Sequence, residues 1–181
     1  MADCPSYNCS DLEAYDPGDS CATYNGGVQK VILYKCGLDT DWTNGAEVQA
    51  AIDAGDAVLL ENVKINWDAP SAETSSSYVA CVTDTPSIYN HSVTFIDRNV
   101  QSASITFYNS ANAATGYTLG GALFWECDAE RVTQADYPML LTGGRVMPDQ
   151  NTDRQRFEHT LTWRTTSGSM PIISTPAGIF N

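Results

Sequence analysis

The segment RFEHTLTWRTT, residues 156–166, decides the fold class, because it alternates more regularly than any other part of the chain. Its large, mostly apolar residues fall on one side: Phe157, His159, Leu161 and Trp163. Its polar residues fall on the other: Glu158, Thr160, Thr162 and Arg164. A period of two with β-branched and aromatic residues is typical of a half-buried β-strand. Because the segment is close to the C-terminus, its partner strands must come from much earlier in the chain, which predicts a mainly β domain.

Other strand patterns lie on the N-terminal side of this segment. Residues 28–35 (VQKVILYK) are apolar enough to form a central strand or one covered on both faces. Residues 116–127 predict a strand in which Gly120 and Gly121 mark a bulge or a close backbone approach. Three further strands are predicted at residues 57–67, 78–83 and 92–97.

The best helix pattern lies within residues 39–55, where Thr43 or Asn44 can cap the start and Gly55 stops the helix. Its short apolar stripe predicts a helix that covers a sheet. Residues 98–113 fit a strand and a helix equally well in their spacing. The β-branched pair Ile105 and Thr106 favours a strand there.

The remaining segments are predicted to connect or extend these elements. Residues 68–77 are polar and contain Pro and Ser, which predicts a long loop. Residues 131–155 predict an extended excursion, because they contain Pro138, Pro148 and a Gly-Gly pair. The chain is thus expected to have an N-terminal arm (1–27), a β-sandwich or barrel with one flanking short helix (28–166), and a C-terminal arm (167–181). The apolar end of that last arm should pack on its own domain or on a neighbouring subunit.

The charge balance is strongly acidic, with 22 acidic and nine basic residues and a formal net charge of −13. Nucleic-acid binders neutralise phosphates with Lys and Arg, so this composition disfavours sequence-specific DNA or RNA binding. Two interpretations remain open. The charge either keeps an abundant protein soluble or lets a surface repel DNA that moves past it.

The cysteine and hydropathy patterns indicate the compartment of the protein and bear on metal binding and membrane insertion. Met1 is followed by neither a basic start nor an apolar run, so the six cysteines are expected to be reduced thiols inside a cell. The spacing of Cys4, Cys9, Cys21 and Cys36 lacks the close pairs of a zinc site, so no metal is expected. No stretch approaches the roughly 20 apolar residues of a membrane span.

Enzymatic chemistry is not expected. The two imidazoles are His91, in a predicted turn without a recognisable partner, and His159, on the apolar side of its strand, where a core histidine is the expected role. The closest acidic pairs, Asp39 with Asp41 and Asp16 with Asp19, lack the length and Gly placement of a calcium loop. No catalytic, metal-binding or cofactor-binding residue is therefore predicted, and no cofactor is expected.

Three motifs resemble those of bacteriophage tail tube proteins, particularly from phages of Bacteroidota. A Cys-containing leader precedes a GG-(V/I)-x-x-(V/I) strand, here residues 26–31 (GGVQKV). An Asp-Arg-x-x-aromatic motif, here residues 153–157, leads into the organising strand and a Pro-containing tail. The middle of the chain carries a similar SVTF strand at residues 92–95.

The resemblance implies a virion structural protein, assembled in the bacterial host cytoplasm. It would be a tail tube subunit that forms homo-oligomeric rings of five or six copies, with a hexamer favoured. Stacked rings would enclose an acidic lumen for DNA passage during ejection, and residues 68–77 and both chain ends would make the contacts between rings. Other virion proteins are expected as further partners. Two departures from the family pattern, at residues 98–113 and 131–155, leave a head–tail joining ring or a capsid decoration protein as alternatives.

A secreted β-sandwich binding module is the alternative from a different class. In that case four tryptophans could form a stacking platform for a ligand: Trp42, Trp67, Trp125 and Trp163. Tryptophans on alternating strands are more often core residues. The cysteines could pair in this alternative, so paired thiols would favour the secreted module and free thiols the intracellular virion protein.

Overall fold

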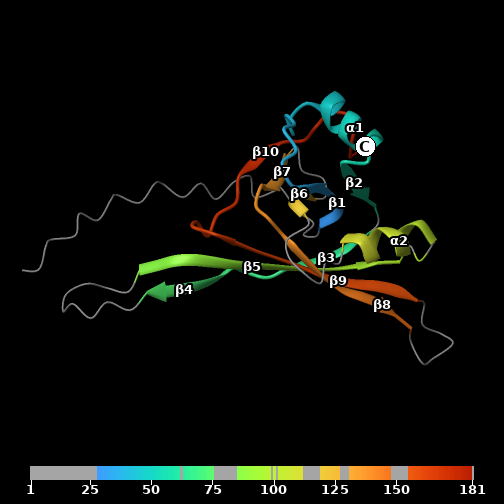
Figure 1. Ribbon diagram of the computed structural model, residues 1–181. Helices are drawn as coiled ribbons and strands as arrows, with labels where there is room; N and C mark the ends of the chain where they lie inside the picture. Colours follow the sequence, from blue (N-terminus) through green and yellow to red (C-terminus); the bar gives the residue numbers. More distant parts are fainter. Residues whose placement is uncertain are drawn as a thin grey trace, which may run out of the picture.

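The fold is two antiparallel sheets with two helices in a computed structural model that describes residues 28–61, 63–75, 85–98, 100, 102–111, 119–126, 131–147 and 155–180 (Figure 1). The first sheet has the order β10-β7-β6-β1-β2, and the second has the order β3-β5-β9-β8, with β4 also paired to β5. The strands of the first sheet are β1 (Val28–Lys35), β2 (Ala57–Leu60), β6 (Leu119–Glu126), β7 (Arg131–Ala135) and β10 (Ile172–Ser174). Those of the second are β3 (Lys64–Trp67), β4 (Ser71–Ser75), β5 (Thr85–Asp97), β8 (Leu140–Val146) and β9 (Arg156–Thr165). The predicted mainly β fold with a flanking helix is confirmed.

The two sheets pack face to face over one core. β9 contributes alternate residues to it, and Phe157, Leu161 and Trp163 are at most 3% exposed. The facing strands β1 and β6 contribute Leu33 and Phe124, which are at most 1% exposed. The alternation predicted for residues 156–166 is thus the burial pattern of β9, in which every second residue is buried.

A second core lies on the other side of the first sheet. Ile32 and Tyr34 of β1 point into it, together with Leu123 of β6, and none of the three is more than 2% exposed. Helix α1 (Gly45–Asp53) covers this face through Val48, which is fully buried. The prediction that residues 28–35 form a strand covered on both faces is therefore confirmed.

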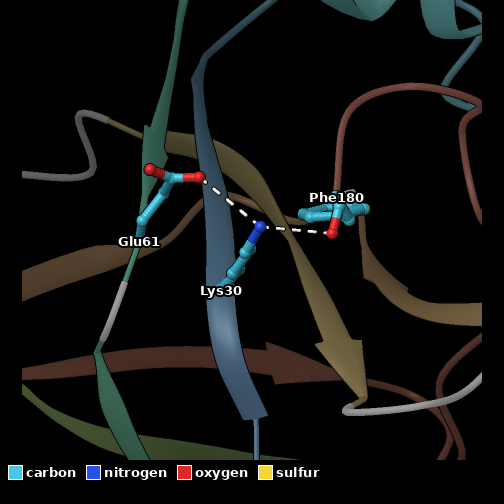
Figure 2. A network of polar contacts seen from close by, with 3 residues as sticks. All are labelled: Lys30, Glu61 and Phe180. Atoms are coloured by element: carbon cyan, nitrogen blue, oxygen red, sulfur yellow. Dashed lines mark hydrogen bonds and ion pairs between the residues drawn. The ribbon is translucent and has the colours of Figure 1, made fainter.

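The C-terminal segment also covers this second core. β10 pairs with β7, and Phe180 is 3% exposed and stacks on Trp125 with a ring distance of 6.1 Å. Figure 2 shows how the segment is held: the Lys30 ammonium donates a hydrogen bond to the Phe180 carbonyl at 3.1 Å and lies 3.4 Å from Glu61. The apolar end of the chain therefore packs on its own domain.

The predicted helix within residues 39–55 is confirmed as α1, with Asn44 as its N-cap. The Asn44 side chain accepts a hydrogen bond from the Ala46 backbone N–H at 3.1 Å. A second helix, α2 (Ser102–Ala111), lies in the segment for which a strand was favoured, so that prediction is wrong. Tyr108 and Ala111 of α2 belong to the core between the sheets. Their spacing of three suits a helix face, and packing on the core outweighs the strand preference of Ile105 and Thr106.

Three more sequence predictions need correction. Residues 57–67 are two strands, β2 and β3, which belong to different sheets. The predicted loop at residues 68–77 contains β4, which pairs with an unexpectedly long β5 that begins at Thr85 rather than Ser92. The predicted excursion at residues 131–155 contains β7 and β8. Residues 1–27 and 78–83, where an arm and a strand were predicted, lie outside the described residues.

Candidate functional site

The second sheet has one face that no other element of the described residues covers. Directly paired residues in antiparallel strands lie on the same face. The pairs Asn66–Thr94, Thr94–Thr160 and Thr160–Thr142 therefore form one row across β3, β5, β9 and β8. All four side chains are exposed or partly exposed. We call this surface, together with the alternate residues above and below the row, the open polar face.

Short hydroxyl side chains form the middle of the open polar face. The hydroxyls of Thr94 and Thr160 lie 3.4 Å apart, and the Thr142 hydroxyl donates to the Thr160 carbonyl at 3.4 Å. Ser92 and Thr162 pair beside them. This part of the face carries no charged side chain, so it offers water and solutes only weak, neutral hydrogen-bonding groups.

Ion pairs flank the hydroxyl row at both ends of β9. At one end, the Arg156 guanidinium donates to the Glu158 carboxylate at 2.6 Å. At the other, Arg164 lies 3.7 Å from Glu73 of β4, whose carboxylate also accepts a hydrogen bond from Asn90 at 2.8 Å. These charges balance one another within the face. Lys64 of β3 adds a third cation to the face, and Asp68, directly after β3, adds a third carboxylate, which accepts a hydrogen bond from Asn66 at 3.3 Å.

The Arg164 end of the face holds a shallow depression of about 460 Å³. β4, β5 and β9 line it with the following residues: Ser71, Asn90, His91, Ser92, Thr162, Trp163 and Arg164. Arg164 is its one cationic side chain and is already close to Glu73. The depression is therefore a polar hollow in the open polar face, and the charge of its Arg164 is balanced by Glu73.

His91 lies below this depression, in β5, and not in the turn that the sequence predicted. Its side chain is 2% exposed, because the strand pairing turns it toward the core opposite Trp163. The imidazole stacks on the Trp163 ring at 5.1 Å, and its Nε2 lies 2.9 Å from the Thr165 hydroxyl. Burial lowers the pKa of His91, and the Ser167 backbone offsets part of this effect. Pro86 misled the prediction, because it lies inside β5 next to a shift in the β4–β5 register.

His159 is a core histidine, as predicted, and is 1% exposed. It stacks on Tyr108 of α2 at a ring distance of 4.2 Å. The Tyr108 hydroxyl donates a hydrogen bond to the Asp97 carboxylate at 2.7 Å. Burial lowers the pKa of His159, while the Thr142 backbone and the Asp97 charge raise it by less. Burial also raises the pKa of Tyr108 far above its usual value.

The four tryptophans do not form a platform. Trp163 and Trp67 pack in the core between the sheets, with ring centres 5.9 Å apart. Trp42 and Trp125 pack in the second core, on the opposite side of the first sheet. The stacking surface considered for a binding module is therefore absent from the described residues.

Metal ligands do not gather anywhere in the part of the chain that the structure describes. Cys36 is an exposed free thiol, and the other five cysteines lie outside that part. No described helix is long and apolar enough to cross a membrane. Comparison of the chain with known protein families, with curated proteins and with solved structures finds no match.

Proposed function

We propose that this chain is a structural subunit of a phage virion, of the tail tube type, whose copies close into rings that stack. The observation that carries the proposal is the contrast between the two sheets. The first sheet is covered on both faces, whereas the second has one open polar face between two sheet edges. An uncovered face of this kind is an expected lining for a channel formed by several copies.

The edges of the second sheet suggest how the copies join. β8 forms one edge and β3 and β4 form the other, and no described strand pairs with their outer sides. A free strand edge carries unpaired backbone N–H and C=O groups. If β8 of one copy pairs with β3 or β4 of the next, the contact is heterologous and can close into a ring. The open polar faces would then merge into one inner wall.

The chemistry of that wall suits the passage of DNA. Hydroxyl groups in the middle of the face are neutral, and the cations Arg156 and Arg164 each lie beside a carboxylate. DNA would therefore meet few free positive charges. The open polar face alone does not supply an acidic lining. The acidic lumen expected from the net charge of −13 stays a prediction for the assembled tube.

Many acidic residues of the described chain lie around α1. Residues 38–61 contain six acidic side chains and no Lys or Arg: Asp39, Asp41, Glu47, Asp53, Asp56 and Glu61. In Figure 1, α1 lies on the side of the first sheet away from β5 and β9. In the proposed tube, this acidic surface would face outward. The resemblance to tail tube proteins supports the proposal independently and implies assembly in a bacterial host and rings of five or six copies.

Electron microscopy of the purified protein tests the proposal together with one substitution at the β8 edge. A Cβ at Gly144 would meet no atom within 4 Å, so Gly144→Lys is expected to leave the subunit folded. Lysine on an edge strand opposes pairing with another strand. We expect stacked rings or tubes for the natural sequence and dispersed subunits for Gly144→Lys.

The control is Gln49→Lys, which adds the same charge to exposed α1, far from the second sheet. This variant should assemble like the natural sequence. Single rings that do not stack would favour the head–tail joining ring instead. Monomers of the natural sequence at high concentration, or tubes formed by Gly144→Lys, would refute the proposed assembly through β8.

A further inference from the structure

Both histidines of this chain occupy the buried face of the β5–β9 pair, each directly opposite an aromatic residue. His91 pairs with Trp163 and His159 pairs with Phe95. The chain has only these two histidines, and each is at most 2% exposed. Because an imidazole is the side chain whose ordinary pKa lies closest to neutral pH, this placement puts the chain's groups most sensitive to mild acid inside its core.

Of the two histidines, His159 lies in the surroundings that are less favourable to a charged imidazole. Neither of its ring nitrogens makes a hydrogen bond with another described residue. The imidazole is surrounded by three aromatic rings, with centroid distances of 4.2 Å to Tyr108, 5.6 Å to Phe95 and 5.7 Å to Phe157. The edge strand β8 also approaches closely, because a Cβ at Gly143 would lie 2.9 Å from His159 Nδ1.

The groups that face His159 come from every element packed around it. Asp97 of β5 is the charged group that acts on its pKa, and Tyr108 of α2 is the titratable neighbour in contact. From β8 come the Thr142 backbone and, opposite Phe157 on the same face, the exposed Arg145. Asp97 is 4% exposed and accepts the Tyr108 hydroxyl at 2.7 Å. Tyr108 therefore covers the His159 imidazole with its ring and bonds the buried Asp97 carboxylate with its hydroxyl.

Tyr108 is also the main attachment of α2. It is 2% exposed, whereas Ile105 and Phe107 of the same helix are only partly buried against the core. Ala111, at 7% exposure, is the other buried residue among those of α2 whose burial the structure describes. The hydrogen bond from Tyr108 to Asp97 is therefore a polar anchor that joins α2 to β5.

We propose that His159, Asp97 and Tyr108 form an acid-sensitive latch that holds α2 on the second sheet. At neutral pH the imidazole is uncharged and the Tyr108 phenol donates to Asp97. When His159 takes up a proton from solvent, the imidazolium is a buried charge beneath the Tyr108 ring, with no hydrogen-bond partner among the described residues. Burying an unpaired charge is costly, so α2 lifts away and lets water reach the imidazolium.

The direction of the pH effect follows from burial. Burial lowers the pKa of His159 in the latched state, whereas an exposed or paired imidazole has an ordinary or higher pKa. The released state therefore binds the proton more tightly. Release is favoured by about tenfold for each pH unit below about 6.5, until the pH reaches the pKa of the latched state.

Deuterium exchange of the full chain, corrected for the intrinsic pH dependence of amide exchange, measures this release. We expect the protection factor of residues 102–111 to lie well below that of β1 at both pH values and to fall about tenfold between about pH 7.5 and pH 5.5. Equal protection factors in α2 and β1 would show that α2 opens only when the whole domain unfolds and would refute a latch. An unchanged protection factor in α2 would refute it too.

Two variants separate the latch from general acid sensitivity. Tyr108→Phe removes one hydroxyl and keeps the ring, so α2 should be weakly protected at both pH values. His159→Phe should keep α2 protected at both. As a control, His91→Gln removes the other buried imidazole and should leave the acid response of α2 unchanged. If His159→Phe folds poorly, His159→Leu takes its place, since a tenfold acid response of α2 that remains without the imidazole would contradict the latch.

Discussion

Close backbone contacts at single glycines bring neighbouring strands of the first sheet together. Gly121 of β6 lies where a Cβ would be 2.2 Å from both the Ala135 carbonyl oxygen and the Tyr34 hydroxyl. A Cβ at Gly120 would likewise lie only 2.5 Å from the Lys35 carbonyl oxygen. The β1–β6 register shifts beside Lys35. The sequence prediction of a bulge or close approach at this pair is therefore confirmed.

At this scale, Gly121→Ala should destabilise the domain by about 2 to 4 kcal/mol, because the methyl group would collide with backbone that cannot move freely. Urea unfolding followed by fluorescence would measure this change. Gly144→Ala is the matched control, since its Cβ would meet nothing within 4 Å. A loss for Gly121→Ala no larger than for the control would show that β7 can shift to make room.

The buried histidines predict acid sensitivity of the whole domain. His91 has a lowered pKa because it is buried, so the unfolded chain binds its proton more tightly than the folded chain. The stabilising contribution of neutral His91 is complete well above about pH 6.5 and is lost as the pH falls from there toward its folded pKa. The expected loss is up to about 1.4 kcal/mol of unfolding free energy per pH unit.

Urea midpoints between neutral and mildly acid pH would test this expectation. His91→Gln keeps a side chain that can bond the Thr165 hydroxyl but cannot take up a proton in this range. Its unfolding free energy should therefore fall less steeply with acid than that of the natural sequence. An identical slope would mean that His91 does not contribute.

At the element scale, the C-terminal segment is held by a small number of contacts. The Lys30 ammonium bonds the Phe180 carbonyl and lies 5.6 Å from the centre of the Trp125 ring. The Lys30 side chain is only 18% exposed, so its contact with Glu61 is less screened than a surface ion pair. Lys30 of β1 therefore adds polar contacts to the apolar packing that holds the end of the chain.

Lys30→Met should therefore loosen the C-terminal segment while keeping most of the packing of the side-chain stem. We expect a loss of about 1 kcal/mol in stability and faster carboxypeptidase trimming up to β10. Lys35→Met provides the control, because the ion pair of Lys35 with Asp56 is on the surface and contributes little. Equal trimming of both variants would contradict a role for the Lys30 contact.

At the scale of the whole molecule, the layers have different roles. The first sheet is buried on both faces and forms the stable centre of the fold. The second sheet is buried on one face, and its strands β5 and β4 extend away from the rest of the domain (Figure 1). A two-stranded ribbon is marginally stable by itself in water, so the β4–β5 extension is suited to contact with another copy.

The net charge of −13 sets a condition for that assembly. Copies of an acidic protein repel one another, and salt screens this repulsion. We expect rings or tubes to form more readily at about 0.5 M NaCl than at about 0.02 M, where the Debye length exceeds about 20 Å. Sedimentation velocity at both salt concentrations would measure the difference. Assembly that weakens with salt would show that attraction between opposite charges drives it instead.

The sequence by itself determined the elements whose pattern is local. The period of two in residues 156–166 defines β9 and its buried face, including His159. The apolar run at residues 28–35 defines β1, and Asn44 defines the start of α1. These features depend on side-chain alternation and capping, which neighbouring residues specify without help from the rest of the chain.

Only the tertiary structure decided how these elements combine. Alternation states which side of a strand is apolar but not which sheet the strand joins, so the division of residues 57–67 between two sheets was missed. The burial of His91 and the helical state of α2 depend on partners distant in the sequence, Trp163 and the core around Tyr108. The open polar face likewise depends on how segments distant in the sequence pack together. A strand with one polar side looks identical in sequence whether that side meets water or another layer, and only long-range packing shows that nothing in the described chain covers it.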